Sequence, residues 1–269
     1  MNPFDYSRPT SIADALLRLR TVEDSRPLAG GMTLLPTLKQ RLAAPVELVD
    51  LDALDALKGI ILKDSEIVVG ALTTHADVAE CEIVGAHLPG LAELAQVIGD
   101  VQVRNRGTIG GSIANNDPAA DYPAALVALN ATVVTTEREI PAEQFFTGMF
   151  DTALTRAELV THIRFPIVRA SAYAKFRHPI SHFAMTGVFI ADTEQGYRVA
   201  VTGAGPVVFR ARVIEDALNA SPTAEAARTA RIKPDGLNTD MHAGADYRVQ
   251  LVSVMAGRAM DAILAQHAA

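Results

Sequence analysis

Two glycine pairs, each close to a hydroxyl residue, constrain this chain more than any other feature of its sequence. One pair is Gly110-Gly111, within the run 105–121, and the other is Gly30-Gly31, within the run 27–35. Glycine accepts positive φ and has no Cβ, so consecutive N–H groups of such turns can converge on an anionic group. We expect the two turns to meet in space and to hold two linked phosphates, the pyrophosphate of a dinucleotide.

Known signatures for phosphate binding and nucleophilic catalysis do not account for these pairs. The chain contains neither the G-x-G-x-x-G nor the G-x-x-x-x-G-K-[ST] pattern, and Pro206 breaks any helix after Gly203-Ala204-Gly205. The run 110–114 resembles the G-x-S-x-G motif around a nucleophilic serine, but that motif needs a helix directly after the serine. The turn-forming residues 115–118 predict no helix there, so Ser112 is not expected to act as a nucleophile. Either glycine pair alone could be only a tight turn, so the dinucleotide hypothesis depends on both.

Composition and charge exclude several other classes of protein. With 269 residues, 49% of them hydrophobic and 20% charged, the chain is long enough for one large or two ordinary globular domains. A net charge of −7 without a run of Lys or Arg disfavours binding to nucleic acid. Cys81 is the only cysteine, which excludes an intrachain disulfide and a cysteine-ligated iron–sulfur cluster, so a redox metal would have to lie on another chain. The sequence shows no leader peptide and no apolar run of ~20 residues, so we expect a cytoplasmic protein that reaches the inner face of a membrane only through partners.

The spacing of apolar residues predicts an α+β protein with antiparallel strands. Helices are expected over 11–20, 33–41, 74–80, 88–98 and 121–130 and from about 211, 223 and 245 onward, with strands at 28–29, 46–50, 60–62, 67–69, 132–135, 159–166, 173–177, 184–191 and 198–202. The absence of βαβ repetition disfavours a parallel sheet. Pro166 and the following Ala170-Ser171 mark a domain boundary near residue 170.

Three positions leave more than one interpretation open. Asp121 could cap the helix that contains Pro123, could accept hydrogen bonds from ribose hydroxyls, or could do both. Lys175 could be a solvated charge at a sheet edge, or its ammonium could face a cofactor and favour an anionic reduced ring. His178 and His182 have the spacing of metal ligands on a helix, but Pro179 between them and the lack of a third ligand favour a loop.

Longer stretches around the glycine pairs resemble a known family. The runs 28–33 and 41–45, together with 106–121, resemble the FAD-binding medium subunit of the molybdenum hydroxylases, a family that includes carbon monoxide dehydrogenase-like and xanthine dehydrogenase-like flavoproteins. The resemblance extends nearly from end to end, because 175–179 and 240–248 are similar to the family's C-terminal flavoprotein domain. It implies a vanillyl-alcohol-oxidase-type (PCMH-type) FAD-binding domain over 1–170, with lobes at about 1–58 and 59–170. A C-terminal α+β domain of the carbon monoxide dehydrogenase flavoprotein type would follow over 171–269 and close over the flavin.

The same resemblance assigns cofactor-binding roles to individual residues. It implies that the pyrophosphate lies between Leu28, Ala29, Gly30, Gly31, Met32, Thr33, Leu34 and Leu35 on one side and Thr108, Ile109, Gly110, Gly111 and Ser112 on the other. Asp121 would bind the adenosine ribose, Asp117 would belong to the same site, Ile98 and Val160 would line the cofactor, and Lys175 would lie close to FAD. Phe183 stands where the family's carbon monoxide enzymes tend to have a tyrosine near the flavin ring, and it can stack on the ring without hydrogen bonding to it. Met32 replaces a more usual histidine or threonine, a change that backbone contacts should survive.

For function, the resemblance implies one subunit of a heterotrimeric oxidoreductase, assembled as a dimer of heterotrimers. A molybdopterin centre on a large partner would oxidise the substrate, [2Fe-2S] clusters on a small partner would carry the electrons, and FAD on this chain would pass them to an external acceptor. Because FAD does the redox chemistry, no catalytic acid or base and no metal is expected on this chain. One alternative is a stand-alone flavin oxidase or reductase of the same fold that acts directly on a small molecule. Another is a nucleotide-binding regulatory or assembly protein without turnover.

Overall fold

An N-terminal lobe is built on a small sheet whose strands all run in the same direction. The computed structural model describes residues 1–268 of the chain. The lobe contains β1 (Asp5–Ser7), α1 (Ile12–Thr21), β2 (Ser25–Leu28), α2 (Leu34–Lys39), β3 (Glu47–Asp50) and the 3-10 helix η1 (Asp55–Leu57). Its three-stranded sheet has the order β1-β3-β2 and is parallel throughout, so the prediction of antiparallel strands is wrong for this lobe. A helix in each connection returns the chain to the same end of the sheet, which is what parallel neighbours require.

The central part of the molecule is a five-stranded antiparallel sheet covered by short helices. It contains β4 (Ile60–Lys63), β5 (Glu66–Gly70), α3 (His75–Glu80), α4 (Glu82–His87), α5 (Pro89–Gln96), α6 (Val101–Arg104), α7 (Ile109–Asn115), α8 (Tyr122–Ala128), β6 (Thr132–Thr135), β7 (Glu139–Pro141), α9 (Ala142–Phe145), β8 (Phe146–Gly148), β9 (Asp151–Thr152) and β10 (Val160–Pro166). The strand order is β4-β5-β10-β6-β7, and β8 and β9 form a separate hairpin. Alternate residues of β5 and β10, namely Ile67, Val69, Ile163 and Phe165, are fully buried because one face of the sheet packs against the helices.

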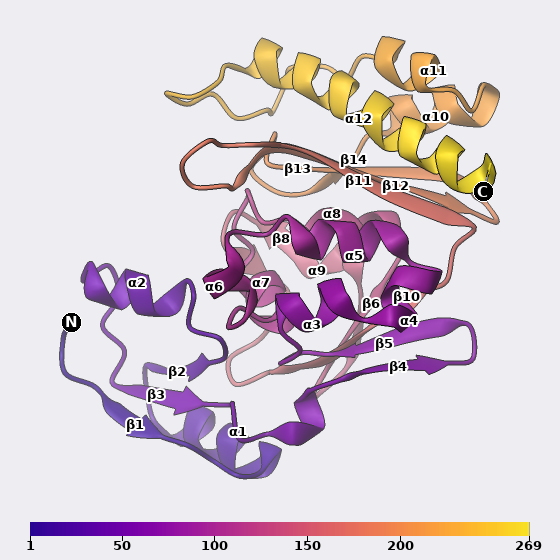
Figure 1. The fold of residues 1–269 in the computed structure, drawn as a ribbon. Helices are drawn as coiled ribbons and strands as arrows, with labels where there is room; N and C mark the ends of the chain where they lie inside the picture. The colour runs from indigo at the N-terminus through magenta and orange to yellow at the C-terminus, as the bar shows by residue number, and fades with distance from the viewer. Residues whose placement is uncertain (269) are drawn as a thin grey trace.

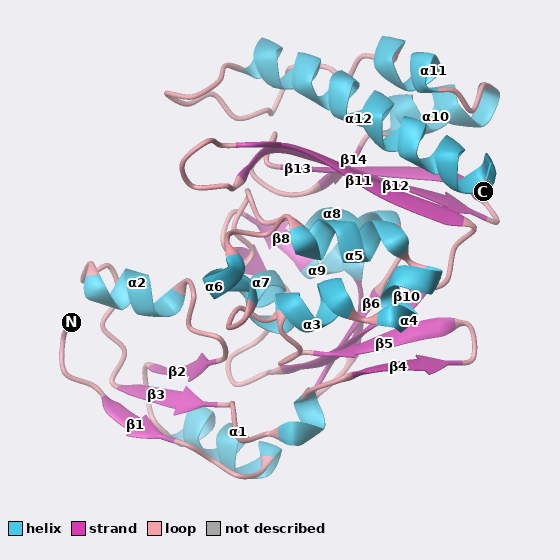
Figure 2. Cartoon of the chain, in the orientation of Figure 1, coloured by secondary structure: helices cyan, strands magenta, loops and turns pink. Residues whose placement is uncertain are grey.

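The C-terminal part adds a second sheet and an outer layer of helices. It contains β11 (Ala170–Arg177), β12 (Ala184–Thr193), β13 (Gly196–Thr202), β14 (Phe209–Arg210), α10 (Arg212–Ala220), α11 (Ala224–Thr229) and α12 (Ala245–Ala268). The four strands form an antiparallel meander in chain order. Figure 1 shows this sheet lying between α5 and α8 on one face and α10 to α12 on the other, and Figure 2 shows the resulting alternation of sheets and helices.

Burial on both faces of the second sheet follows from the residues of β12. Side chains along a strand alternate between faces. Val188 and Ile190 belong to the apolar cluster beneath α12, whereas Phe189 and Ala191 belong to the cluster formed with α5 and α8. A nearly continuous apolar run is typical of a strand that is covered on both sides. The C-terminal sheet therefore shares its hydrophobic core with the central part of the chain.

Candidate cofactor site

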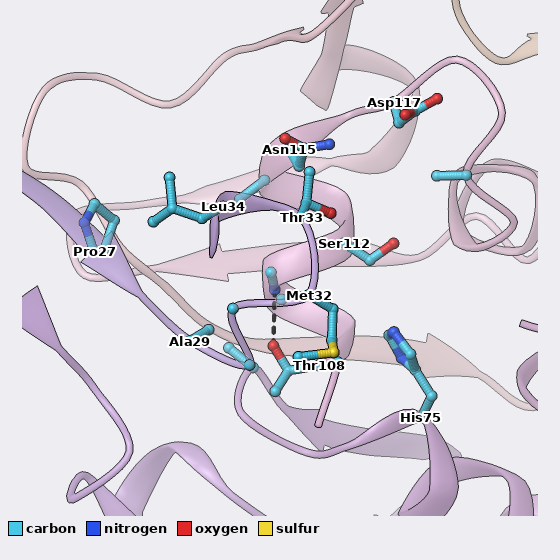
Figure 3. Close-up of a pocket in the computed structure, with 18 of the residues that line it drawn as sticks. Pro27, Ala29, Met32, Thr33, Leu34, His75, Thr108, Ser112, Asn115 and Asp117 are labelled. Carbon is cyan, nitrogen blue, oxygen red and sulfur yellow. Dashed lines mark hydrogen bonds between the residues drawn. The ribbon is translucent and has the colours of Figure 1, made fainter. Parts of the chain in front are cut away.

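A cavity of about 590 Å³ lies where the N-terminal lobe, the central helices and the β11–β12 loop meet. Its volume lies within the range typical of cofactor pockets. The walls come from the segment after β2, the start of α3, the loop before α6, the helix α7 and the segment 154–160. Figure 3 shows the side chains of Met32 and Thr33 beside α7, while that of Leu34 points away from the helix toward Pro27.

The structure brings the two glycine motifs into direct contact. A Cβ added to Gly30 would lie 1.9 Å from the carbonyl oxygen of Arg106 and 2.8 Å from the Cα of Gly107. On the other motif, a Cβ added to Gly111 would lie 3.5 Å from the Cβ of Ala29. Because the backbones are this close, the first motif cannot carry a side chain at Gly30 without separating the two segments.

The local structure of the second motif differs from the sequence prediction. Only Gly31 of the four paired glycines has positive φ, at 75°, because Gly110 and Gly111 lie in the first turn of α7. Thr108 caps this helix by accepting a hydrogen bond from the Gly111 N–H at 3.1 Å, drawn as a dashed line in Figure 3. Asn116, in the left-handed conformation at φ 44°, ends the helix, so the turn residues 115–118 terminate a helix instead of preventing one. Ser112 lies inside α7 and not at a strand-to-helix turn, which agrees with its exclusion as a nucleophile.

The two motifs also differ in which backbone donors remain available. Along α7, the N–H groups of Ile109, Gly110 and Gly111 donate to Thr73 O, Ala71 O and Thr108 Oγ1. In the turn that follows Gly30, the backbone N–H groups of residues 31–34 have no acceptor among residues 1–268. A set of consecutive unclaimed N–H groups beside a cavity is suited to an anionic group such as a phosphate. The residues present therefore fit a dinucleotide cofactor, with the donors supplied mainly by the first motif.

Most of the predicted site residues border the cavity. Those that do are Ala29, Gly30, Gly31, Met32, Thr33, Leu34, Ile98, Thr108, Gly110, Gly111, Ser112, Asp117, Asp121, Val160 and Phe183. Leu28, Leu35, Ile109 and Lys175 are not part of the cavity lining. The side chains of Leu28 and Leu35 pack beneath Gly31, whose added Cβ would lie 3.3 and 2.9 Å from them, and Ile109 is fully buried in the core. These three residues therefore stabilise the two motifs by packing on the side away from the cavity.

Asp121, in the cavity wall, forms a buried ion pair with Lys175 behind it. The Lys175 Nζ lies 2.9 Å from Asp121 Oδ1, and each side chain is only 4% exposed. Tyr173 OH donates to the same carboxylate at 2.6 Å, and Lys175 also donates to the Val97 carbonyl oxygen at 3.1 Å. Burial raises the pKa of Asp121, while Lys175 and Tyr173 oppose that effect.

This arrangement decides between the earlier interpretations of the two residues. Asp121 is the N-cap residue of α8, but its side chain makes no capping hydrogen bond, so the carboxylate is not used for the cap. Lys175 is enclosed, so the prediction of a solvated edge charge is also wrong. The partners of Asp121 are more than 50 positions away along the chain, which places the carboxylate at the junction of the C-terminal sheet and the cavity.

In the wall formed by residues 154–160, the sequence indicated only Val160. The wall is organised by Glu158, which is buried and accepts hydrogen bonds from Thr135 Oγ1 at 2.7 Å, the Thr155 N–H at 2.9 Å and Arg138 Nε at 3.1 Å. Burial alone would raise the pKa of Glu158, but these hydrogen bonds hold it down to about 2. The carboxylate thereby fixes the loop that carries Leu154, Leu159 and Val160 to the cavity.

His75 is a second residue that sequence reasoning missed. It borders the cavity, is only 5% exposed, and its Nδ1 is enclosed without a hydrogen-bond partner. Burial, with a smaller effect from Arg104, lowers the pKa of the imidazole to about 4, so the ring is neutral near pH 7. The sequence signals only a helix start here, through the capping box of Thr74 and Asp77, and that signal says nothing about where the imidazole lies.

The histidines of the β11–β12 loop do not form a metal site. His178 packs edge to face on His242, with ring centroids 4.6 Å apart, and its Nδ1 accepts the backbone N–H of Ser181 at 3.2 Å. Nδ1 of His182 lies 3.3 Å from the Gly99 carbonyl oxygen, where the loop enters the cavity beside Phe183. Across residues 1–268, no three side chains of His, Cys, Asp or Glu are grouped as a metal site requires.

Comparisons with known proteins were made for the sequence and for the fold. Residues 2–168 match the family described as the FAD binding domain in molybdopterin dehydrogenase. The chain is 35% identical to the carbon monoxide dehydrogenase medium chain of Hydrogenophaga pseudoflava, over 98% of each chain. It is also 35% identical to the nicotine 6-hydroxylase medium subunit of Paenarthrobacter nicotinovorans, over 94% of each.

Solved structures show the same similarity in three dimensions. A chain of the carbon monoxide dehydrogenase from Hydrogenophaga pseudoflava superposes with a TM-score of 0.90 at 36% identity, covering 99% of both chains. A chain of the reconstituted enzyme from Oligotropha carboxidovorans gives a TM-score of 0.91 at 32% identity, covering 98% of this chain and 99% of that one. None of the helices within residues 1–268 is both long enough and apolar enough to span a membrane.

Proposed function

Because this chain belongs to the family described as the FAD binding domain in molybdopterin dehydrogenase, we propose that it is the FAD-carrying, electron-transferring medium subunit of a molybdenum hydroxylase. The mixed α+β fold with an FAD-binding domain is confirmed by this membership and by the superposed structures. Bound FAD supplies the redox chemistry, while the protein binds and orients it. The observation that carries the proposal is the cavity at the contact between the glycine motifs, bordered by unclaimed backbone donors.

We assign the pyrophosphate to the contact between the two motifs. The N–H groups of residues 31–34 donate to its oxygens, and the hydroxyl of Ser112 faces the same space in Figure 3. The absence of side chains at Gly30 and Gly111 lets the two backbones approach closely enough for both motifs to reach one diphosphate. The positive φ of Gly31 turns the chain so that successive N–H groups face the cavity.

The remaining predicted residues divide between the two ends of the cofactor. Asp117 and Asp121 border the cavity, and we assign their carboxylates as acceptors for ribose hydroxyls, with Asp121 sharing its oxygens with Tyr173 and Lys175. Ile98, Val160 and Phe183 provide apolar surface for the flavin end. Lys175 donates hydrogen bonds to the Asp121 carboxylate and to the Val97 carbonyl oxygen, so we propose that it positions Asp121 and does not contact the cofactor itself. We propose that the segment 171–269 completes the site as the C-terminal flavoprotein domain.

The proposed partners follow from the medium-chain names of the relatives. We propose a large subunit with the molybdopterin centre and a small subunit with [2Fe-2S] clusters, assembled as a dimer of heterotrimers. The relatives named above are medium chains or medium subunits of such enzymes. The lone Cys81 is consistent with iron–sulfur clusters on another subunit.

Purification of the chain from its native source tests this proposal. The expected product is a yellow complex that contains one FAD per copy of this chain, together with a larger chain, a smaller chain, molybdenum and iron. Gel filtration and metal analysis measure the assembly, and the flavin released by acid measures the FAD. A chain that binds no FAD in any assembly would refute the proposal, as would a yellow chain that oxidises a small molecule without partners.

A further inference from the structure

We propose that His75 is an additional contact of the bound cofactor and donates a hydrogen bond to the diphosphate where the glycine motifs meet. The inference rests on the proposed function and adds a residue that lies outside both motifs.

The imidazole of His75 is held in place but lacks a protein partner. His75 is 5% exposed and borders the cavity. Its Nδ1 is fully enclosed without a hydrogen-bond partner among the described residues, whereas Nε2 keeps accessible surface, so Nε2 is the nitrogen that a ligand in the cavity can reach. Buried polar side chains in folded proteins nearly always have a partner, so an unsatisfied one beside a cavity indicates a ligand. A neutral imidazole carries one N–H, which suits an anionic oxygen.

The position of His75 identifies which part of the cofactor it would meet. An isolated antiparallel bridge joins Thr74 to Thr108, and the His75 N–H donates to the Gly107 carbonyl oxygen at 2.9 Å. A Cβ on Gly107 would lie 2.6 Å from His75 Nε2, so the ring packs directly on this glycine. Gly30 of the first motif meets the same segment, because its added Cβ would lie 2.8 Å from the Gly107 Cα. Figure 3 shows the imidazole extending toward Ser112 and Met32, on the side of the cavity where Thr108 begins α7.

Tyr122 offers the competing explanation and the matched control. Its hydroxyl is also buried without a partner, and its ring centroid lies 5.3 Å from that of His75. An enclosed water could satisfy both groups and give them a purely structural role. Tyr122 does not border the cavity, however, so only His75 is placed to reach a cofactor.

The test compares three variants in the flavin-depleted native complex. Affinities for FAD and for ADP, which keeps the diphosphate but lacks the flavin, are measured by titration calorimetry, and folding is measured by thermal melting. His75→Phe should weaken both ligands by a similar factor of about 10 to 100, as expected for one hydrogen bond to a charged group. His75→Gln, whose amide can place an N–H near the position of Nε2, should recover part of the loss. Tyr122→Phe should leave both affinities within about twofold of the wild type, which is less than one neutral hydrogen bond contributes.

Several outcomes would overturn the inference. Wild-type affinity for FAD and ADP in both His75 variants would show that the imidazole does not contact the cofactor. Equal effects of His75→Phe and Tyr122→Phe would assign the pair to a shared water. A loss for FAD without a loss for ADP would place the contact on the flavin and not on the diphosphate. Failure of the wild-type complex itself to bind FAD would instead refute the proposed function, so the two failures are distinguishable.

Discussion

Replacement of Gly30 by alanine tests the contact between the two glycine motifs most directly. The added Cβ would lie 1.9 Å from the Arg106 carbonyl oxygen, whereas ordinary contacts begin at 3.4 Å, so one segment must move by about 1.5 Å. The obstacle is backbone and cannot rotate away. Because Gly30 does not have positive φ, the substitution tests this steric contact alone.

The magnitude follows from the contacts that such a movement disturbs. Overpacking of this kind costs about 1–3 kcal/mol of unfolding free energy. The movement also displaces the N–H groups of residues 31–34 relative to the cofactor phosphates. Each hydrogen bond to a charged group contributes about 1.5–3 kcal/mol, so losing two would weaken FAD binding by about 3–6 kcal/mol, or at least ~100-fold.

Fluorescence titration of FAD and thermal melting of the same samples provide the assay. Gly85→Ala is the matched control, because it lies in α4 and its added Cβ meets no atom of the described chain within 4 Å. That control should retain FAD affinity and gain about 0.5–1 kcal/mol of stability from helix propensity. If Gly30→Ala binds FAD as tightly as Gly85→Ala does, the contact between the motifs is not what forms the phosphate site.

Three further predictions concern the supports of the cavity. Asp121→Asn should lower the free energy of unfolding in urea by about 3–5 kcal/mol, because it leaves Lys175 buried without its ionic partner. The double variant with Lys175→Met should recover part of that loss. Strictly additive losses for the two substitutions would argue against the ion pair. Glu158→Gln should lower the free energy of unfolding by about 1–3 kcal/mol near pH 7. This difference from the wild type should shrink as the pH falls from about 4.5 toward about 2, because the depressed native pKa makes the wild-type carboxylate lose its stabilising effect in that range. A difference that does not change with pH would show that the charge is not involved. Asn116→Ala should lower the melting temperature by more than Asn116→Gly does. Both variants lose the side-chain hydrogen bonds to the β8–β9 hairpin, but only alanine resists the left-handed conformation of residue 116. Equal melting temperatures would show that this backbone conformation does not determine the effect.

Local patterns predicted much of the fold because many elements carry their own signals. Ser11 caps α1 and Thr74 caps α3, as helix-start signals indicate. The hairpin expected at 60–62 and 67–69 is present as β4 and β5. The parallel pairing of the N-terminal strands was not predictable from alternation, which reports the exposed face of a strand and not the direction of its neighbour.

The site was predicted where motifs act through the backbone and missed where it depends on distant contacts. Glycine at 110 and 111 indicated a turn, but the structure uses these positions for close helix packing, with an added Cβ on Gly110 lying 2.6 Å from the Ala71 side chain. The partners of Asp121 lie on another sheet, and no local rule connects them. His75 follows an ordinary helix cap, and only the tertiary structure shows that its imidazole is enclosed beside the cavity.

The shared core beneath the C-terminal sheet has a consequence for how the protein can be divided. A fragment ending where the family match ends, at residue 168, would uncover the apolar surface that receives Phe189 and Ala191 and would strip Asp121 of both its partners. Such a fragment would contain every glycine of the phosphate cradle and still present an aggregation-prone face. Because Tyr173 and Lys175 both lie on β11, the Asp121 side of the cavity is complete only when the C-terminal sheet has docked on the helices beneath it.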